Sequence, residues 1–207
     1  YIVDNGVDYP GGNNHGSVAC INGQWYIFYH RMTNGTIASR RGCVEKITIL
    51  PDGTIPPVEM TSLGFEDSLN PYEVTPADIA CVLKGGAFVT EKNVFDRVVT
   101  NIQDGSVIGY KYYDFGDDFG SMTMEFSAKI LGMGCDAVMY ILIDGEDGEE
   151  IGCCRIGHDS SAIHTIVKSV TGRHAVFFKI TTEYVGWMGE MFQGRNLFEL
   201  CSFVFLK

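Results

Sequence analysis

The sequence predicts an all-β protein, and three observations support that prediction. Apolar and polar residues alternate along much of the chain, as in residues 122–130, and this period of two is typical of a strand with one buried face. Asn-Gly and Asp-Gly pairs, which tolerate the backbone of tight turns, separate the candidate strands. A helix is suggested only at residues 75–83, with Thr75 as its N-cap and Pro76 at its first position.

The expected strands are β-rich runs bounded by Gly, Asn or Asp. In chain order they are residues 18–21, 24–30, 44–50, 107–115, 122–130, 137–143, 174–181 and 197–206. Turns, several of them hairpins, are expected at Asn22-Gly23, Asn34-Gly35, Asp52-Gly53, Asp104-Gly105 and Asp144-Gly145.

The chain is expected to contain two regions. Residues 56–76 hold four of the six prolines and few strand patterns, which makes this segment the best candidate linker. We place the division near Tyr72, between a first region of residues 1–71 and a second of residues 72–207.

Composition excludes several classes of partner. The 207 residues carry a formal net charge of -11, from 15 Lys and Arg against 26 Asp and Glu. Because no basic cluster is present, we expect no nucleic-acid partner and no binding to anionic membranes. The longest apolar stretch, residues 137–143, has the length of a strand and is too short to span a membrane.

The cysteines bear on the cellular compartment without deciding it. Their number, 7, and their spacing fit neither a zinc site nor a disulfide framework, so most are expected to be buried thiols. Thiols favour a reducing, cytoplasmic compartment. We interpret the start at Tyr1 as cut, and secretion directed by an upstream signal is the alternative.

The first region resembles the last blade of the five-bladed β-propeller of glycoside hydrolase family 43, whose members act on xylan and arabinan side chains. The matching residues are 14–17 (Asn-His-Gly-Ser), 23–31, the Ser-Arg-Arg of 39–41, and 50–58 with Thr61 and Gly64. The resemblance implies that His15 lies on the propeller axis, often near a bound calcium ion and its waters. It implies that Arg41, or less favourably Arg40, contacts the sugar. The structural alternative for His15 is a hydrogen-bonded role, and that for Arg40 and Arg41 is a surface pair.

The same resemblance implies that the carboxylates of the reaction lie upstream of Tyr1. Family 43 enzymes invert the anomeric centre with two Asp and one Glu in earlier blades, and inversion needs an acid and a base on opposite sides of the scissile bond. The acidic residues of the first region do not replace them convincingly. We therefore expect the chain alone to be inactive, and the missing blades, which would cover the faces of this one, to come from the same or another polypeptide. The acidic residues considered are Asp4, Asp8, Glu45, Glu59, Glu66 and Asp67.

The second region resembles a family 6 carbohydrate-binding module, a β-sandwich of the jelly-roll type. The resemblance is carried by Ala77-Asp78, Gly86, Thr90-Glu91, Asp104-Gly105, residues 107–108, 114–116, 143–144, Gly148, 151–152 and 171–178. Such modules stack aromatic rings on sugars, but Val107 and Ile163 stand where the family has its aromatic residues. Asn196 matches the amide beside them.

A different aromatic platform and a calcium site are also considered. Trp187, with Tyr184 and Phe192, could stack on a sugar, and packing is the structural alternative. Asp78 and Glu91 match two ligands of the family's structural calcium. Cys201 replaces a later Asp and is a poor ligand for a hard cation. The acidic turn at residues 144–150 is expected to be a solvated hairpin tip.

These observations predict the C-terminal part of a glycosidase that hydrolyses xylan- or arabinan-type side chains with inversion. The expected ligand is a xylo- or arabino-oligosaccharide. Two alternatives remain open, namely a non-catalytic carbohydrate-binding module and a structural sandwich that buttresses the propeller.

Overall fold

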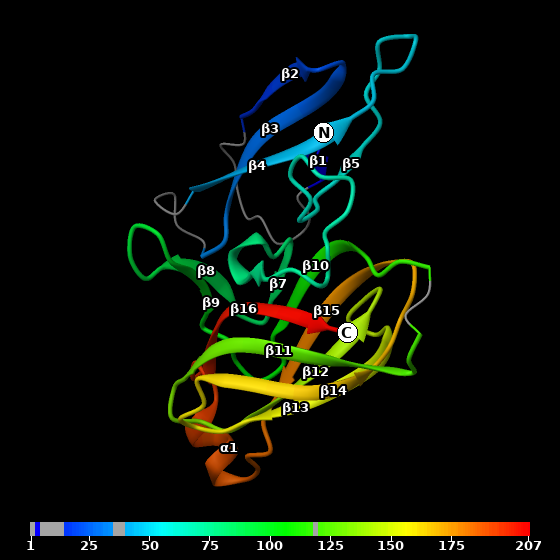
Figure 1. The fold of residues 1–207 in the computed structure, drawn as a ribbon. Coiled ribbons are helices and arrows are strands. Elements are labelled where there is room, and N and C mark those ends of the chain that lie inside the picture. The colour runs from blue at the N-terminus through cyan, green and yellow to red at the C-terminus, as the bar shows by residue number, and fades with distance from the viewer. Residues whose placement is uncertain (1–2, 5–14, 35–39, 118–119) are drawn as a thin grey trace.

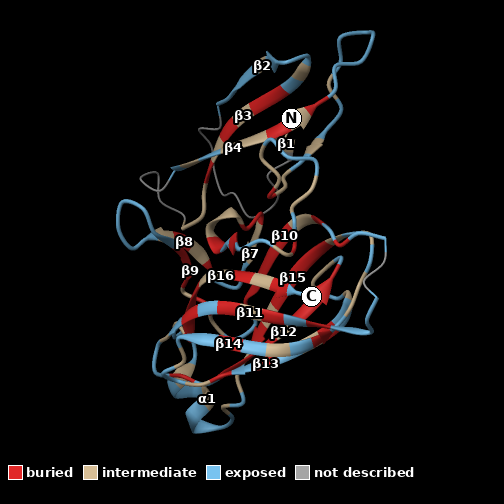
Figure 2. Cartoon of the chain, in the orientation of Figure 1, coloured by how far each residue is buried: buried red, intermediate tan, exposed pale blue. Residues whose placement is uncertain are grey.

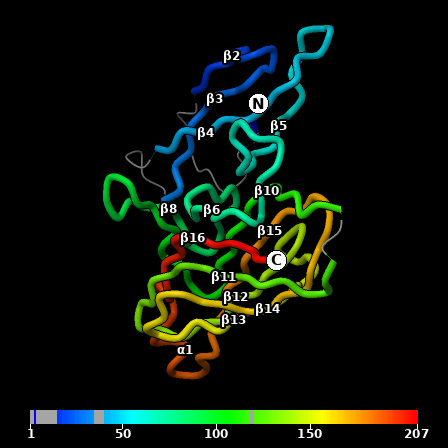
Figure 3. Tube along the Cα trace, viewed as in Figure 1, coloured from blue at the N-terminus to red at the C-terminus, as the bar shows by residue number. Residues whose placement is uncertain are grey.

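The chain folds into two β regions, shown in Figure 1. The structure, a computed structural model, describes residues 3–4, 15–34, 40–117 and 120–207. We call β2, β3 and β4 the N-terminal sheet and the two large sheets that follow the sandwich. Figure 3 traces the N-terminal sheet at one end of the molecule and α1 (Trp187–Phe192) at the other. Among the described residues, no helix has the length and hydropathy to cross a membrane.

The N-terminal sheet is antiparallel and contains β2 (Ser17–Ile21), β3 (Gln24–Met32) and β4 (Arg40–Ile47) in that order. Asn22 and Gly23 have φ of 51° and 83° in the turn between β2 and β3, so the predicted hairpin is confirmed. The third strand was expected at residues 44–50. It begins earlier, at Arg40, and ends earlier, at Ile47, because its pairing with β3 runs from Met32 opposite Arg40 to Trp25 opposite Ile47. The turn predicted at Asn34-Gly35 lies partly outside the described residues.

The candidate linker is hydrogen-bonded to both regions. Its β5 (Val58–Glu59) pairs in parallel with β1 (Val3–Asp4). The backbone N–H of Thr61 donates to Glu45 at 2.8 Å, and that of Leu69 donates to the carbonyl of Tyr112 at 2.8 Å. These bonds attach the segment to the N-terminal sheet on one side and to the sandwich on the other.

The sandwich consists of two antiparallel sheets. One has the order β13-β12-β15-β10-β7, and the other has the order β14-β11-β16-β9-β8, with β6 also paired to β16. The strands are β6 (Thr75–Pro76), β7 (Val82–Lys84), β8 (Phe88–Glu91), β9 (Arg97–Thr100), β10 (Val107–Asp114), β11 (Thr123–Gly132), β12 (Ala137–Ile143), β13 (Glu149–Ile156), β14 (Ala162–Lys168), β15 (Arg173–Thr181) and β16 (Phe198–Leu206).

Aromatic side chains from both sheets form the centre of the sandwich core. The ring of Phe203 lies 4.8 Å from that of Tyr110 and 4.9 Å from that of Phe178, in edge-to-face contacts that such rings prefer. Figure 2 shows buried stretches along the strands of both sheets of the sandwich and along β3. Along β11 every second residue from Met124 to Ile130 is buried, which confirms the alternation read from the sequence.

The helix expected at residues 75–83 is wrong. Thr75 and Pro76 form β6, which pairs with Ser202 and Phe203, and only the short 3-10 helix η1 (Ala77–Ile79) follows. The hydroxyl of Tyr113 donates to the Thr75 hydroxyl at 3.1 Å inside the core. Burial and pairing of this segment against β16 thus outweigh its local helix signals.

The six-residue helix α1 was not expected. Its sequence carries two glycines at or near its start, Gly186 and Gly189, and glycine disfavours a helix. The partly buried side chains of Tyr184 and Phe192 hold the two ends of this segment against the core.

Candidate functional site

Arginine side chains join the N-terminal sheet to the sandwich. Arg31, at the end of β3, is buried, and its guanidinium donates to the backbone carbonyls of Ala80 and Cys81, the latter at 3.1 Å. It also approaches the Met60 sulfur at 3.8 Å. These carbonyls follow η1, so Arg31 supplies donors where the helix leaves its acceptors unpaired.

A second set of contacts lies beside the first. Arg41, on β4, donates to the Val89 carbonyl at 3.1 Å and forms an ion pair with Glu91 at 3.0 Å. The Thr33 hydroxyl accepts a bond from the Val89 N–H at 3.0 Å. The junction between the two regions is therefore strongly polar and uses the backbone of β8.

His15 and Arg41, predicted to support sugar cleavage, lie on opposite faces of the N-terminal sheet. The exposed His15 ring lies edge-on to the His30 ring at 5.2 Å. Arg41 is directly opposite Arg31 in the β3-β4 ladder, and His30 and Arg31 are successive residues that point to opposite faces. The neighbouring Arg40 is exposed. The sugar contacts of these residues stay predictions.

Glu45 is the buried carboxylate of the N-terminal sheet. It accepts bonds from the Tyr29 hydroxyl at 3.1 Å and from the Thr61 N–H and hydroxyl at 2.8 and 2.6 Å. Burial raises the pKa of Glu45, and the three donors oppose this rise. A raised carboxyl pKa is common in general acids, but protein donors occupy both oxygens here, so the geometry indicates a structural role.

Two of the other acidic residues considered in this region, Glu59 and Asp67, also have partners. Glu59 accepts bonds from the Lys111 ammonium at 2.7 Å and from the Tyr112 hydroxyl at 2.8 Å. Asp67 is paired with Lys46, and Glu66 is exposed. Asp8 and the side chain of Asp4 lie outside the described residues.

Asn196, the predicted sugar-binding amide, binds the segment at the end of β9. Its oxygen accepts a bond from the Ile102 N–H at 2.9 Å, and its nitrogen donates to the Thr100 hydroxyl at 3.1 Å. Val107 and Ile163, at the positions of the family's aromatic residues, are both buried. This end of the sandwich therefore presents no ring at either position.

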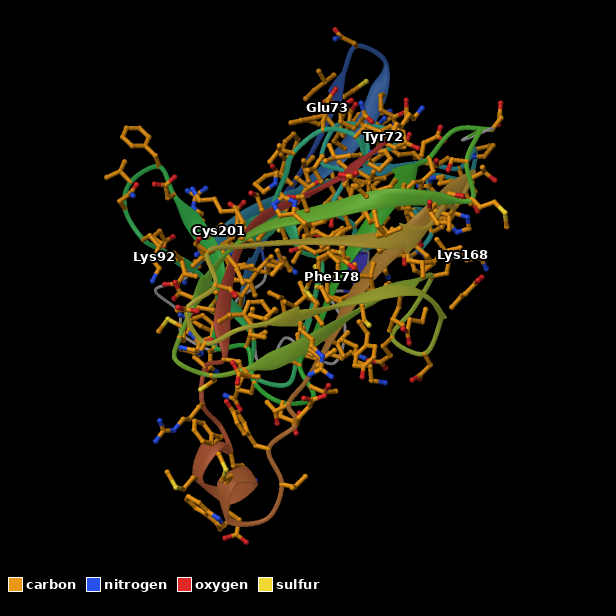
Figure 4. All side chains as sticks on the ribbon, turned by 60° about the horizontal axis from the view of Figure 1, so that its bottom comes forward. Tyr72, Glu73, Lys92, Lys168, Phe178 and Cys201 are labelled. Atoms are coloured by element: carbon orange, nitrogen blue, oxygen red, sulfur yellow. The ribbon has the colours of Figure 1, made fainter. Side chains whose placement is uncertain are left out.

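Trp187 lies apart from the two aromatic residues that were grouped with it. The Tyr184 and Phe192 rings stack on each other at 4.3 Å and 17°. Trp187 is 69% exposed on α1, next to exposed Val185 and Met191. Figure 4 shows α1 projecting from the sandwich. Trp187 is thus available as a flat apolar surface, whereas the other two rings pack.

A cleft near α1 was not predicted from the sequence. It has a volume of about 420 Å³ and is lined by Tyr184, Arg155, Glu183 and Asp136, among others. Arg155 and Glu183 form a two-pronged ion pair at 2.6 and 2.8 Å, and the Tyr184 hydroxyl accepts the Asp136 N–H at 2.8 Å. The alternation pattern could not reveal this cleft because its residues come from three separate segments.

A larger open cleft of about 860 Å³ lies at the junction. Its lining includes Thr33, Lys84, Phe88 and Asn101. The Asn101 amide donates to the Gly86 carbonyl at 2.7 Å, so this side chain serves the local backbone.

The predicted calcium ligands Asp78 and Glu91 are both paired with arginine. Arg97 approaches Asp78 at 3.6 Å and Glu91 at 3.9 Å, and Arg41 also contacts Glu91. Among the described residues, no group of three or more His, Cys, Asp and Glu could hold a metal ion. Because calcium takes six to eight oxygen ligands, the side chains at this position do not fit it.

Comparison with known proteins gives relatives of both regions, although no family model matches the chain. A xylosidase/arabinosidase of Thermoclostridium stercorarium is 46% identical over 128 residues, which are 51% of this chain and 27% of that protein. The structure of a glycoside hydrolase family 43 arabinoxylan arabinofuranohydrolase from Bacillus subtilis, in complex with cellotetraose, is 26% identical. It has a TM-score of 0.63 and covers 95% of this chain and 41% of that chain.

The sandwich has relatives of its own. A family 6 carbohydrate-binding module from Clostridium cellulolyticum, in complex with xylose, matches 67% of this chain and 100% of its own length with a TM-score of 0.55. At 21% identity this match shows the fold. The chain spans less than half the length of the two enzymes above. It is similar to the C-terminal portion of a glycoside hydrolase family 43 enzyme, in which a propeller-type sheet precedes a family 6 carbohydrate-binding-module-like β-sandwich.

Proposed function

We propose that this chain is the C-terminal part of a glycosidase that hydrolyses xylan- or arabinan-type side chains or oligosaccharides with inversion. The observation that carries the proposal is the similarity to a family 43 arabinoxylan arabinofuranohydrolase, which runs through both regions and covers 95% of the chain. The expected ligand is a xylo- or arabino-oligosaccharide.

In this proposal, propeller blades outside these residues supply the reacting carboxylates. An inverting enzyme holds its acid and base about 6.5–9.5 Å apart, with room for a water molecule. The oxygens of Glu45 and Glu59 are instead bound by protein donors. His15 and Arg41, or Arg40, would support the site from this chain.

The exposed apolar residues of the N-terminal sheet support a missing neighbour. Val18, Ile21 and Trp25 are each about two-fifths exposed, and blades of a propeller cover the faces of adjacent blades. We propose that further blades, from the same or another polypeptide, cover these side chains.

An activity comparison tests the proposal. The 207-residue chain and a longer product that includes the upstream coding region are assayed with aryl xylosides and aryl arabinofuranosides. We expect turnover from the longer product only. Turnover by the short chain that is lost in Glu45→Gln and kept in the exposed control Glu183→Gln would refute the proposal.

The junction favours a second role for the sandwich, that of a structural buttress for the propeller. Three side chains of the N-terminal sheet, Arg31, Thr33 and Arg41, bind backbone atoms of the sandwich, whereas the expected ring positions are buried aliphatic residues. Calorimetry with xylo- and arabino-oligosaccharides separates the two roles. A buttress gives no saturating heat, whereas saturation that Trp187→Ala or Tyr184→Ala abolishes identifies a carbohydrate-binding module.

A further inference from the structure

The β8-β9 hairpin and η1 bring together Glu91 and Asp78, the acidic residues of the predicted calcium position. Glu91 ends β8 and is directly opposite Arg97, which begins β9, in the antiparallel ladder. Asp78 lies in η1, which packs against β9. Opposite charges that face each other across two strands attract, so the β8-β9 hairpin places a guanidinium between the two carboxylates.

The N-terminal sheet supplies a second guanidinium to the same carboxylates. Arg41 is only 12% exposed in its side chain and contacts Glu91 at 3.0 Å. The hydrogen bond from Arg41 lowers the pKa of Glu91, which keeps the carboxylate charged. Glu91 therefore binds one arginine from each region of the molecule.

The cation next to Glu91 in the sequence serves another carboxylate. Lys92 forms an ion pair with the buried Glu199 at 2.6 Å, and the Thr100 hydroxyl also donates to Glu199 at 2.8 Å. Thr100 and Arg97 point to opposite faces of β9 because three residues separate them. A cation placed between Asp78 and Glu91 would therefore meet the arginines that already bind these carboxylates.

We infer that Asp78 and Glu91 form an arginine-binding site that replaces a metal ion, filled by Arg97 from the sandwich and by Arg41 from the N-terminal sheet. The site stabilises this end of the sandwich and at the same time fastens the two regions together. A calcium ion could do the first of these, but Arg41 adds the second because it is anchored on β4. This inference does not depend on the proposed glycosidase activity.

Thermal unfolding of the whole chain with and without calcium is the first test. A ligand that binds only the folded state raises the unfolding midpoint. We expect the same midpoint in chelator and in millimolar calcium chloride, and no calorimetric heat of calcium binding. A midpoint that rises with calcium would overturn the inference.

Variants of the arginines provide the second test. In chelator, Arg41→Gln combined with Arg97→Gln is expected to lower the midpoint by more than Arg155→Gln, which breaks an exposed ion pair elsewhere. A loss no larger than that of the Arg155 control would contradict a fastening role.

Discussion

The sandwich and the N-terminal sheet are both antiparallel, but they differ in how their apolar residues are buried. The sandwich closes two sheets over a continuous core that includes Tyr110, Phe178 and Phe203. The N-terminal sheet has three strands, and its Val18 and Trp25 remain partly exposed. A sheet must bury its apolar face against another element, so the N-terminal sheet depends on its contacts in a way that the sandwich does not.

Polar contacts at the junction compensate for the incomplete burial of the N-terminal sheet. Arg31, Thr33 and Arg41 bind backbone atoms of the sandwich, and Glu45 ties the linker to β3 and β4. Such bonds are directional and hold an orientation, whereas an apolar contact would permit sliding. The comparison teaches that one region is stable through its own core and the other through its attachment.

Truncation of the sandwich core should have the largest effect. Phe203→Ala removes a ring that lies near five other aromatic rings, including Tyr110 and Phe178. It should lower the free energy of unfolding by about 3–5 kcal/mol. Urea denaturation measures this loss. Phe65→Ala, at a half-exposed linker ring that lies edge-on to Tyr26 of the N-terminal sheet, is the matched control. An equal loss in the control would remove the distinction between the two regions.

Removal of Arg31 should act on the attachment. Arg31→Ala leaves the carbonyls of Ala80 and Cys81 without this donor, at a cost of about 1.5–3 kcal/mol for hydrogen bonds to a charged group. Hydrogen exchange should show faster exchange in β3 and β4, with β11 and β16 unchanged. Uniform acceleration in both regions would mean that they unfold as one unit.

Glu45 should give the N-terminal sheet its own pH dependence. Its pKa is raised in the folded state by burial, so the folded state binds this proton more tightly. The resulting stability is present below the pKa of the unfolded chain, about 4.3, and is lost as pH rises through the folded pKa. Cys43, Glu59, Tyr29 and Thr61 surround or bind the carboxylate.

The variant Glu45→Gln tests the direction of this pH dependence of stability. The variant loses accepted bonds at every pH, at a cost of about 1–3 kcal/mol, but it removes the titration. Urea midpoints at several pH values should therefore show the advantage of the wild type shrinking as pH rises above about 4. An advantage that grows with pH would show that the carboxylate is stabilised in its charged form.

Trp187→Ala should have the smallest effect on stability. The side chain is mostly exposed on α1, and exposed substitutions change the free energy of unfolding by about 0.5 kcal/mol or less. Phe192→Ala, which breaks the stacked pair with Tyr184, is the matched control and should lose more. A large loss in Trp187→Ala would mean that this ring packs in the folded protein.

Apolar patterns and turn dipeptides predicted eight of the sixteen strands that the structure describes, and β13 and β14 are the longest of those that were missed. Residues 137–143 were predicted as a strand and form β12 with the same bounds, and the hairpin at Asn22-Gly23 is confirmed. The helix predicted at residues 75–83 shows where local patterns fail. These residues carry local helix signals, yet pairing with β16 and burial of Thr75 decide their structure.

The candidate site was less predictable than the strands. The sequence pointed to Asp78 and Glu91 but gave no sign that arginines occupy them, because Arg41 approaches Glu91 from a separate sheet. Asn196 was identified as a polar residue of interest, but its bonds to Ile102 and Thr100 depend on segments distant in the chain.

By itself the sequence determined the β architecture, the positions of half of the strands and the resemblance to two known modules. These properties depend on local patterns, since a period of two and a turn dipeptide act within a few residues. Only the tertiary structure decided which charged and polar groups meet. Such contacts join residues of different sheets. Burial and hydrogen-bond satisfaction select their partners, which no local sequence pattern encodes.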